Sequence, residues 1–383
     1  MRACITITSI SMIISRTPYR ISFFGGGTDY PSWYQEHGGA VLSTTINHYC
    51  YLTCRYLPPF FQTKSRIVWS QIENVTDNSQ IAHPAVRAVL QYFEGEKNGV
   101  EVSHSGDLPA RSGLGSSSAF TVGLLNAMNA LQGRMSNKRE LACEAVYIER
   151  DVLKENVGVQ DQIATAYGGF NKIAILPTGD FAVEPVILPA GRLEELQSHF
   201  LLFFTGVSRN ASDIAKEQME TVGHKKAELT ELRKLVDEAL DVVMHARDIS
   251  SFGQLLHETW KIKRTLSPSI APDFVNDVYM RAHSAGALGG KLLGAGGGGF
   301  MVFFAKPEHH EAIRKELQDF LWVPFKFETG GSSIIFYDPS SYSPGSLARR
   351  DFYHLREGEK GVSTSSGADK VIPMNVKKRI TTL

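Results

Sequence analysis

Apolar residues in the first half of the chain form two kinds of pattern. Blocks rich in Val, Ile, Tyr and Thr fit a pleated, half-buried surface and predict strands; these blocks are 13–24, 41–57, 67–69 and 100–103. Apolar residues three and four positions apart predict helices; this spacing occurs over 83–93, from Phe120 to Leu131, and over 138–153. Strands and helices are therefore mixed in this half.

The second half is richer in helical spacing. Helices are expected over 211–246, with a break at Gly223, and then over 252–266, 273–287 and 312–320. Strands are expected over 200–204 and 333–337, and 292–304 reads as a strand, a glycine hairpin and a strand. The change in pattern near residue 190 predicts two domains, 13–190 and 191–339.

Both ends differ from these domains. Residues 1–12 read as a loosely attached leader, with Met12 as an alternative start. Residues 340–383 are rich in Ser, Gly and charge with little apolar periodicity, and we expect a disordered tail.

Composition narrows the class of protein. A chain of 383 residues with 43% hydrophobic residues is long enough for two cores. Lys+Arg and Asp+Glu both number 40, so no overall field favours nucleic acid or an anionic membrane. No apolar run reaches the about 18 residues of a membrane helix. The four cysteines give no disulfide framework, and Cys50 and Cys54 face the same side of a strand, which favours core packing. We expect a reduced, cytoplasmic protein.

The stretch 107–120, DLPARSGLGSSSAF, is the strongest local signal for chemistry. Gly113 and Gly115 permit positive φ and close approach of a ligand, and three serines then open a helix. The unpaired N–H groups of that helix start form a phosphate site. A simple serine N-cap is the alternative, but a cap needs one serine rather than three. The stretch is not a P-loop, since GxxxxGK[ST] does not occur.

Two acidic segments accompany it. In 16–30, a strand leads into three glycines, which are followed by Thr28 and Asp29. The carboxylate of Asp29 can accept hydrogen bonds from sugar hydroxyls, or it can simply cap a turn or a helix. In the helix 138–153, Glu149 lies at the edge of a stripe formed by Leu141, Ala145, Ile148 and Val152. Glu149 is suited to Mg²⁺ or to a surface ion pair. Asp161 by itself reads as the N-cap of a short helix.

The segment 294–299, GAGGGG, contains the letters GxGxxG. A dinucleotide site would need a helix after it, whereas Phe300 begins a strand. We therefore reject an oxidoreductase.

Taken together, PxxSGLGSSSA, RTPYRISFFGGGTDYP, ERxxxxxxxGxxDQxxxxxGG and GAGGGG resemble the motifs of the GHMP kinases. The resemblance covers roughly 13–337. It implies an α+β, two-domain GHMP kinase fold, with an N-terminal ribosomal-protein-S5-like α/β domain that binds ATP and a C-terminal ferredoxin-like α+β domain.

The resemblance also implies roles for residues. Asp161 is the catalytic base, Arg20 the active-site arginine, and Thr28 and Asp29 bind the sugar. Glu149 and Ser116 hold Mg²⁺. The ATP phosphates are wrapped by a loop that comprises Pro109, Ser112, Gly113, Leu114, Gly115, Ser116, Ser117 and Ser118.

Within the family, the chain most resembles D-glycero-D-manno-heptose 7-phosphate kinases, which act on the anomeric hydroxyl in the supply of nucleotide-activated heptose for surface polysaccharide. Galactokinases carry Gly-Glu-His-Thr-Asp where this chain has Gly-Gly-Gly-Thr-Asp. Fucose, arabinose and hexosamine remain alternative substrates. A non-catalytic sugar and ATP sensor is a third possibility, which a retained base disfavours.

A heptose 7-phosphate needs a cationic pocket away from the ATP loop. Arg209, with Ser208 beside it, is the first candidate because a guanidinium binds phosphate through two hydrogen bonds. Lys261, Lys263 and Arg264 are further candidates, against the alternative of ordinary solvated charges.

Overall fold

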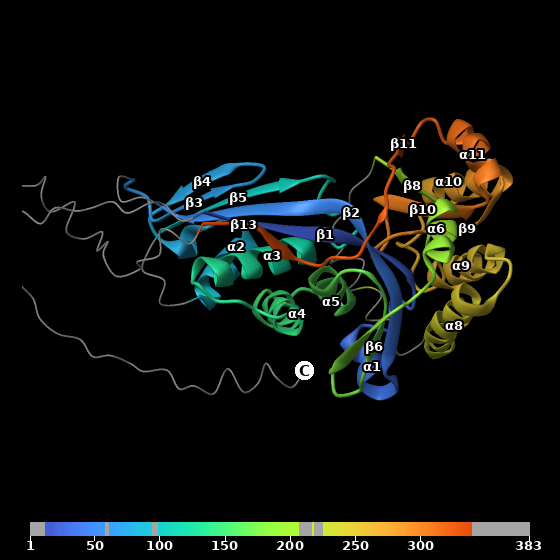
Figure 1. The fold of residues 1–383 in the computed structure, drawn as a ribbon, viewed down its shortest axis with the longest axis horizontal. Helices are drawn as coiled ribbons and strands as arrows, with labels where there is room; N and C mark the ends of the chain where they lie inside the picture. The colour runs from blue at the N-terminus through green and yellow to red at the C-terminus, as the bar shows by residue number, and fades with distance from the viewer. Residues whose placement is uncertain (1–11, 58–60, 94–98, 207–216, 218–224, 339–383) are drawn as a thin grey trace, which may run out of the picture.

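The computed structural model describes residues 12–57, 61–93, 99–206, 217 and 225–338. Residues 1–11 of the expected leader, Arg209 and the expected tail lie outside the described residues, whereas Met12 begins the first strand. The described strands form two sheets, each covered by helices (Figure 1). No helix in these ranges is long and apolar enough to cross a membrane.

The larger sheet has nine strands built around the long antiparallel pair β1 (Met12–Phe24) and β2 (Gly39–Tyr56). Its main path runs β13-β1-β2-β5-β3-β4, where the further strands are β3 (Ser65–Val68), β4 (Ile72–Val75), β5 (Val100–Gly106) and β13 (Ser333–Tyr337). Three short strands extend it beside β2: β6 (Phe170–Ile175), β7 (Phe181–Pro185) and β12 (Phe327–Glu328).

Helices cover one face of this sheet (Figure 1): α2 (Pro84–Tyr92), α3 (Ser116–Leu131), α4 (Lys138–Val146) and α5 (Gln160–Tyr167). A short helix, α1 (Pro31–His37), joins β1 to β2. In the first part of β1 buried residues alternate with partly exposed ones. From Thr17 to Phe24 every residue is buried. That half of β1 is buried on both faces because α3 and α5 and also the second lobe pack against it.

The second lobe is a four-stranded sheet of order β11-β8-β10-β9. Its strands are β8 (Phe200–Phe204), β9 (Ala287–Leu292), β10 (Phe300–Ala305) and β11 (Leu321–Trp322). Its helices are α6 (Ala190–Ser198), α8 (Lys226–His245), α9 (Ser250–Lys263), α10 (Asp273–Ser284) and α11 (His310–Glu316). Figure 1 shows this lobe at the right, against the ends of β1 and β2.

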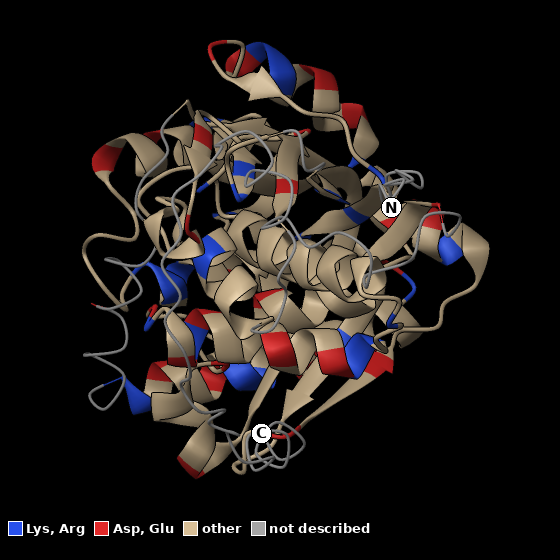
Figure 2. Ribbon diagram, turned by 90° about the vertical axis from the view of Figure 1, so that its left-hand side faces the viewer, with Lys and Arg blue, Asp and Glu red and all other residues tan. Residues whose placement is uncertain are grey.

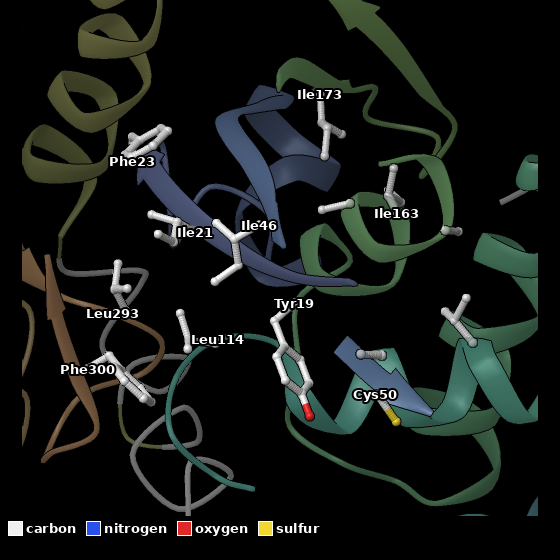
Figure 3. Packing of buried hydrophobic residues seen from close by; sticks show 14 of the residues in the cluster. Tyr19, Ile21, Phe23, Ile46, Cys50, Leu114, Ile163, Ile173, Leu293 and Phe300 are labelled. Carbon is white, nitrogen blue, oxygen red and sulfur yellow. The ribbon is translucent and has the colours of Figure 1, made fainter. Parts of the chain in front are cut away.

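Aromatic packing joins the two lobes. Phe23 at the end of β1 stacks on Phe200 of β8 with ring centroids 4.9 Å apart, and meets Phe252 of α9 edge-on at 5.8 Å. All three rings are buried. Figure 3 shows the same junction from close by, with Leu114 beside Leu293 and Phe300. Offset and edge-on pairs of this kind add to the free energy gained by burial, so the lobes share a core where the chain motifs meet.

The strands expected at 200–204 and 333–337 are confirmed, as are the helices within 83–93, 252–266 and 273–287. Cys50 and Cys54 are free and buried, as expected for core residues. The helix expected over 211–246 is described only as α8. The division at residue 190 stays a prediction, and the structure adds that β12 and β13 return to the first sheet.

One local expectation is wrong. The expected helix 138–153 ends as an α-helix at Val146 and continues as a π-helical turn, Tyr147–Val152. In this turn the N–H of Leu153 donates to the carbonyl of Ile148 at 2.9 Å, five residues back. The wider turn changes which side chains face inward. Val152 is therefore 40% exposed rather than part of the stripe, whereas Glu149 is buried rather than at the edge.

Candidate active site

A cavity of about 730 Å³ lies where the motifs of the two lobes meet. The first lobe contributes the end of β1, the start of α3, the π-helical turn and the start of α5, and the second lobe contributes Lys263, Leu266, Lys291, Gly294 and Ala295. Charged residues of both signs are interspersed around the molecule (Figure 2). Binding of a phosphate must therefore depend on local geometry in this cavity.

The expected phosphate loop forms the wall at the start of α3. Gly115 caps the helix with φ 71°, and Ser116, Ser117 and Ser118 form its first turn. Gly113 has φ 86°, and an added Cβ would lie 2.4 Å from the carbonyl oxygen of Leu293. A side chain at Gly113 is therefore excluded by both conformation and space. The first backbone N–H groups of a helix have no partner within it, and the residues that carry them here line the cavity, as a phosphate site requires.

The glycine hairpin at 294–299 supports the loop instead of binding a dinucleotide. The N–H of Phe300 donates to the carbonyl of Ser112 at 3.1 Å, and a Cβ on Gly299 would lie 2.3 Å from that same oxygen. The glycines thus let the second lobe approach the phosphate loop at backbone distance.

The eight residues expected to wrap ATP divide into two groups. Gly113, Gly115, Ser116, Ser117 and Ser118 line the cavity. The other three hold the loop from behind and do not line it: the hydroxyl of Ser112 donates to the carbonyl of Pro109 at 2.7 Å, and the buried Leu114 accepts the backbone N–H of Arg20 at 3.0 Å.

Arg20 and Asp161 form a bidentate ion pair in the cavity. Nε of Arg20 donates to Oδ1 of Asp161 at 2.7 Å, and Nη2 donates to Oδ2 at 2.6 Å. Nη1 donates to the carbonyl of Gly113 at 2.6 Å, which ties the pair to the phosphate loop. The guanidinium is almost fully buried, but a quarter of the Asp161 side chain stays exposed. A carboxylate held in this way keeps a fixed orientation while one side remains open to a substrate.

Asp29 lies beside this pair and is buried. Its Oδ1 accepts the N–H of Gly27 at 3.0 Å, and its Oδ2 accepts the N–H of Gln160 at 3.5 Å. Burial raises the pKa of Asp29 to about 6. Gly158 leaves room for the buried carboxylate of Asp29, because a Cβ at position 158 would lie 1.8 Å from Oδ2 of Asp29.

Thr28 does not line the cavity. Its hydroxyl donates to the carbonyls of Gly25 and Ala40 at 2.8 and 3.0 Å and accepts the N–H of Ala40 at 3.2 Å. These bonds fix the glycine turn that carries Asp29. The structure therefore brings Asp29 to the cavity and leaves Thr28 behind it.

Glu149 faces the serines of the loop from the π-helical turn. Its Oε2 accepts hydrogen bonds from Ser118 Oγ at 2.9 Å and from Gln162 Nε2. The hydroxyl of Ser116 accepts the N–H of Arg111 at 3.1 Å, and the expectation that Ser116 shares a cation with Glu149 stays a prediction. Sequence reasoning missed Ser118 and Gln162 as partners of Glu149, because no spacing rule links residues 118, 149 and 162.

The surroundings of Glu149 fit a Mg²⁺ ion. Among the described residues, Oε1 of Glu149 and Oε1 of Gln162 are both buried and find no hydrogen-bond partner. Burial, with a smaller contribution from Glu155, raises the pKa of Glu149 to about 7, and a cation beside the carboxylate would offset both effects. The described residues contain no cluster of three or more His, Cys, Asp or Glu side chains suited to a metal. Mg²⁺ needs no such cluster where one carboxylate and substrate phosphates hold it.

The sequence did not predict an aromatic pocket at another part of the cavity. His83 stacks on Phe120 with ring centroids 4.7 Å apart, and Trp69 meets His83 edge-on at 4.8 Å. Burial lowers the pKa of His83 to about 4, so the ring is neutral near pH 7. A flat, neutral, apolar pocket suits a nucleobase. Its residues come from three separate segments, and no local motif marks them.

Two buried lysines complete the wall from the second lobe. Lys263 at the end of α9 and Lys291 on β9 both line the cavity. Lys261, another candidate from the sequence, lies on the outer surface and pairs with Glu258 at 3.0 Å. Arg264 is not among the residues that line the cavity.

A helix start that can hold phosphate, facing an arginine-held carboxylate, is suited to phosphoryl transfer to an alcohol. Comparison with known proteins leads to the same class. The family model described as GHMP kinases N terminal domain matches residues 80–169, and the one described as GHMP kinases C terminal matches 226–321. The chain belongs to the GHMP kinases and is an ATP-dependent kinase that transfers a phosphoryl group to a hydroxyl.

Its relatives include sugar kinases. A D-glycero-alpha-D-manno-heptose 7-phosphate kinase of Campylobacter jejuni is 29% identical over 325 residues, covering 80% of this chain and 96% of that protein. An L-fucokinase/L-fucose-1-P guanylyltransferase of Bacteroides fragilis is 27% identical, covering 82% of this chain and 37% of that protein. A solved structure of a D-glycero-D-manno-heptose 1-phosphate kinase from Bacteroides thetaiotaomicron matches with TM-score 0.68 at 26% identity, covering 85% of this chain and 99% of that one. The chain is thus a sugar kinase of the GHMP family.

Proposed function

We propose that the chain transfers the γ-phosphoryl group of ATP to the anomeric C1 hydroxyl of D-glycero-D-manno-heptose 7-phosphate, giving the 1,7-bisphosphate. The observation that carries the chemistry is the bidentate pair of Arg20 and Asp161, held against the phosphate loop by the Gly113 carbonyl. The choice of sugar rests on likeness to the Campylobacter jejuni relative.

In this proposal the open side of Asp161 accepts the proton of the C1 hydroxyl as the phosphoryl group is transferred. Arg20 keeps the carboxylate oriented and offsets negative charge that develops near it. Asp29 binds hydroxyls of the sugar through the part of its carboxylate that the backbone N–H groups leave open. Thr28 supports Asp29 from behind through its bonds to the turn.

The N–H groups from Gly113 to Ser118 hold the ATP phosphates, and the pocket of Trp69, His83 and Phe120 holds the adenine. Glu149 supplies the carboxylate for Mg²⁺, with Ser118 and Gln162 orienting it and Ser116 on the same wall. When bound, the cation neutralises charge on the β- and γ-phosphates. Arg209 remains a candidate for the sugar phosphate and lies outside the described residues.

The test is a measurement of ADP release with a panel of purified sugars. Heptose 7-phosphate is expected to give the highest kcat/KM, with the product carrying its new phosphate at C1 by phosphorus NMR. Unphosphorylated heptose, fucose, arabinose and a hexosamine complete the panel. A preference for fucose would favour the second candidate, which the Bacteroides fragilis relative suggests. ATP binding without turnover of any sugar would indicate a sensor.

A further inference from the structure

Two buried lysine side chains line the cavity from the second lobe. Lys263 is 7% exposed and Lys291 is 2% exposed. Within the described part of the chain, neither ammonium group forms an ion pair with a carboxylate. Lysine is almost never fully buried unless it is paired, so this arrangement requires an explanation.

Backbone carbonyls account for some of the hydrogen-bond donors. Nζ of Lys263 donates to the carbonyls of Leu292, at 3.2 Å, and Gly294, and Nζ of Lys291 donates to the carbonyl of Phe23 at 2.9 Å. Each ammonium carries three N–H groups. When protonated, Lys263 has one further donor and Lys291 has two that these bonds do not use, and both residues line the cavity.

The charges in this corner are more positive than negative. Burial lowers the pKa of Lys263 to about 8, and burial together with the charges of Lys263 and Arg20 lowers the pKa of Lys291 well below its ordinary value. The acidic groups that face the lysines are Asp29 and Asp161, and Arg20 already pairs with Asp161. Two lysines and one arginine thus face two aspartates, and a bound anion would favour the protonated form of both lysines.

The position of the pair separates it from the metal end of the cavity. Lys291 acts electrostatically on Lys263, Arg20 and Asp29, whereas the charge that acts on Glu149 is that of Glu155. Lys291 also comes from β9 in the second lobe, on the Asp29 side, and not from the loop that begins α3. Lys263 also donates to the carbonyl of Gly294, which packs against Gly113 of the phosphate loop. An anion at the two lysines therefore belongs either to the molecule that contacts Asp29 or to the γ-phosphate of ATP, and the kinetic test below separates the two.

We infer that Lys263 and Lys291 form a subsite for the phosphate that the sugar substrate already carries, and so select a phosphorylated sugar over its unphosphorylated form. The inference rests on the proposed function and deepens it. It keeps Lys263 from the candidates that the sequence offered beside Arg209, leaves out Lys261 and adds Lys291, which no motif singled out. A purely structural role, in which each lysine only ties carbonyls of β1 and the hairpin, would not require a charge at either position.

The test uses the full chain and the variants Lys263→Met and Lys291→Met. Methionine keeps the length of the side chain and its apolar stem, and loss of an unpaired buried charge need not destabilise the fold. Each variant is expected to raise KM for heptose 7-phosphate by about 10- to 100-fold, the size of a charge-assisted hydrogen bond. KM for ATP and KM for unphosphorylated heptose should change less than about threefold. Lys261→Met, on the outer face of the same helix, is the matched control and should behave as wild type.

A second readout does not depend on turnover. Inorganic phosphate should raise the melting temperature of the wild type and of Lys261→Met, and raise it less in Lys263→Met and Lys291→Met, because a ligand stabilises only the protein that binds it. Equal stabilisation of all four proteins would overturn the inference, including for a variant that has lost activity.

The kinetic outcomes separate the subsite from the proposed substrate. Equal losses on both sugars, or a rise in KM for ATP, would overturn the subsite and assign the lysines to structure or to the γ-phosphate. If another sugar phosphate is preferred with the same lysine dependence, the subsite stands and heptose is wrong. If the wild type prefers unphosphorylated sugars, the subsite and the heptose 7-phosphate assignment both fail.

Discussion

At the scale of single residues, four carboxylates line the cavity, and each has a different environment. Asp161 is fixed by Arg20, Asp29 by backbone N–H groups, and Glu149 by Ser118 and Gln162. Glu155, the fourth, lines the cavity, and burial raises its pKa. The different environments give different tasks, since a carboxylate's partners decide which of its oxygens stays available.

Asp161→Asn is expected to lower kcat by about 100- to 10,000-fold, because the amide keeps the shape but cannot accept a proton. Binding of ATP, measured by calorimetry, should be retained. Asp180→Asn is the control: Asp180 also pairs with an arginine, Arg139, but away from the cavity, and its loss should leave kcat near wild type. Near wild-type turnover of Asp161→Asn at saturating substrates would leave Asp161 only as a helix N-terminal residue.

Glu149→Gln is expected to raise the Mg²⁺ concentration that gives half the maximal rate by about tenfold or more, since the carboxylate is the charged ligand. Excess Mg²⁺ should restore part of the rate. Glu144→Gln, on α4 and outside the cavity, should leave the Mg²⁺ dependence unchanged. A Mg²⁺ dependence of Glu149→Gln equal to that of the wild type would remove Glu149 from the cation site.

Asp29 gives a prediction for stability against pH. Burial raises its pKa from 3.8 to about 6, so the folded state holds this proton more tightly than the unfolded state does. Its favourable contribution is complete below pH 3.8 and is lost as pH rises through 6. Asp29→Asn removes the titration. At pH 8 the unliganded variant should therefore be more stable than wild type, by roughly 2–3 kcal/mol at most, while KM for the sugar rises.

Urea unfolding at pH 4.5 and pH 8 measures this difference. Asp180 provides a control of opposite sign, because its hydrogen bond with Arg139 lowers its pKa. Asp180→Asn should destabilise the protein at pH 8 and do so less as pH falls toward the acid range. A difference between Asp29→Asn and wild type that does not grow with pH would contradict the role of burial.

Residues inside a local motif were predictable, and residues that meet only in the fold were not. Arg20, Asp29, Glu149 and Asp161 each stand in a recognisable string and line one cavity. Ser118 was assigned to ATP rather than to Glu149, and the pocket formed by Trp69, His83 and Phe120 has no string of its own. Thr28 shows the converse: a residue within a motif can serve the turn and not the cavity.

At the scale of elements, the cavity depends on backbone geometry that side-chain patterns do not record. The strands and helices with long apolar patterns were predictable, including β8 and α9. The π-helical turn at 147–152 was not, because its hydrogen bonds shift to the residue five back without altering the apolar spacing around it. The two-residue strand β12 is likewise too short to leave a pattern. The π-helical turn carries Glu149 into the cavity wall.

Gly113→Ala tests the close contact between the phosphate loop and the second lobe. An added Cβ would meet the Leu293 carbonyl at 2.4 Å in a backbone with φ 86°. The loop must shift, and we expect KM for ATP to rise by about tenfold or more, as for loss of a charge-assisted hydrogen bond. Gly191→Ala is the control, because it lies in α6 with nothing within 4 Å of the added Cβ. If both variants bind ATP as wild type does, the loop does not depend on this contact.

At the scale of the whole molecule, the chain returns to the first sheet after it has built the second lobe. β12 pairs with β2, and β13 pairs with β1 at an edge of the nine-stranded sheet. The segment between them is tied to helices as well: the N–H of Ser332 donates to the carbonyl of Thr165 at 3.0 Å, and its hydroxyl lies 2.8 Å from that of Thr17. The first lobe is therefore incomplete without residues that follow the second.

Two truncations of the chain separate this returning segment from the tail. A chain ending at Asp338 keeps β12 and β13. The composition of the residues after it predicts that they bury too little apolar surface to stabilise the fold. Activity and melting temperature should therefore stay near those of the full chain. A chain ending at Pro324 removes both strands and exposes the edge of β1, which is a template for aggregation. That chain should appear in the insoluble fraction on expression, and the first should be soluble. Loss of activity in the chain ending at Asp338 would assign a role to the tail. A soluble, cooperatively melting chain ending at Pro324 would instead show that the first lobe folds without the strands that return to it.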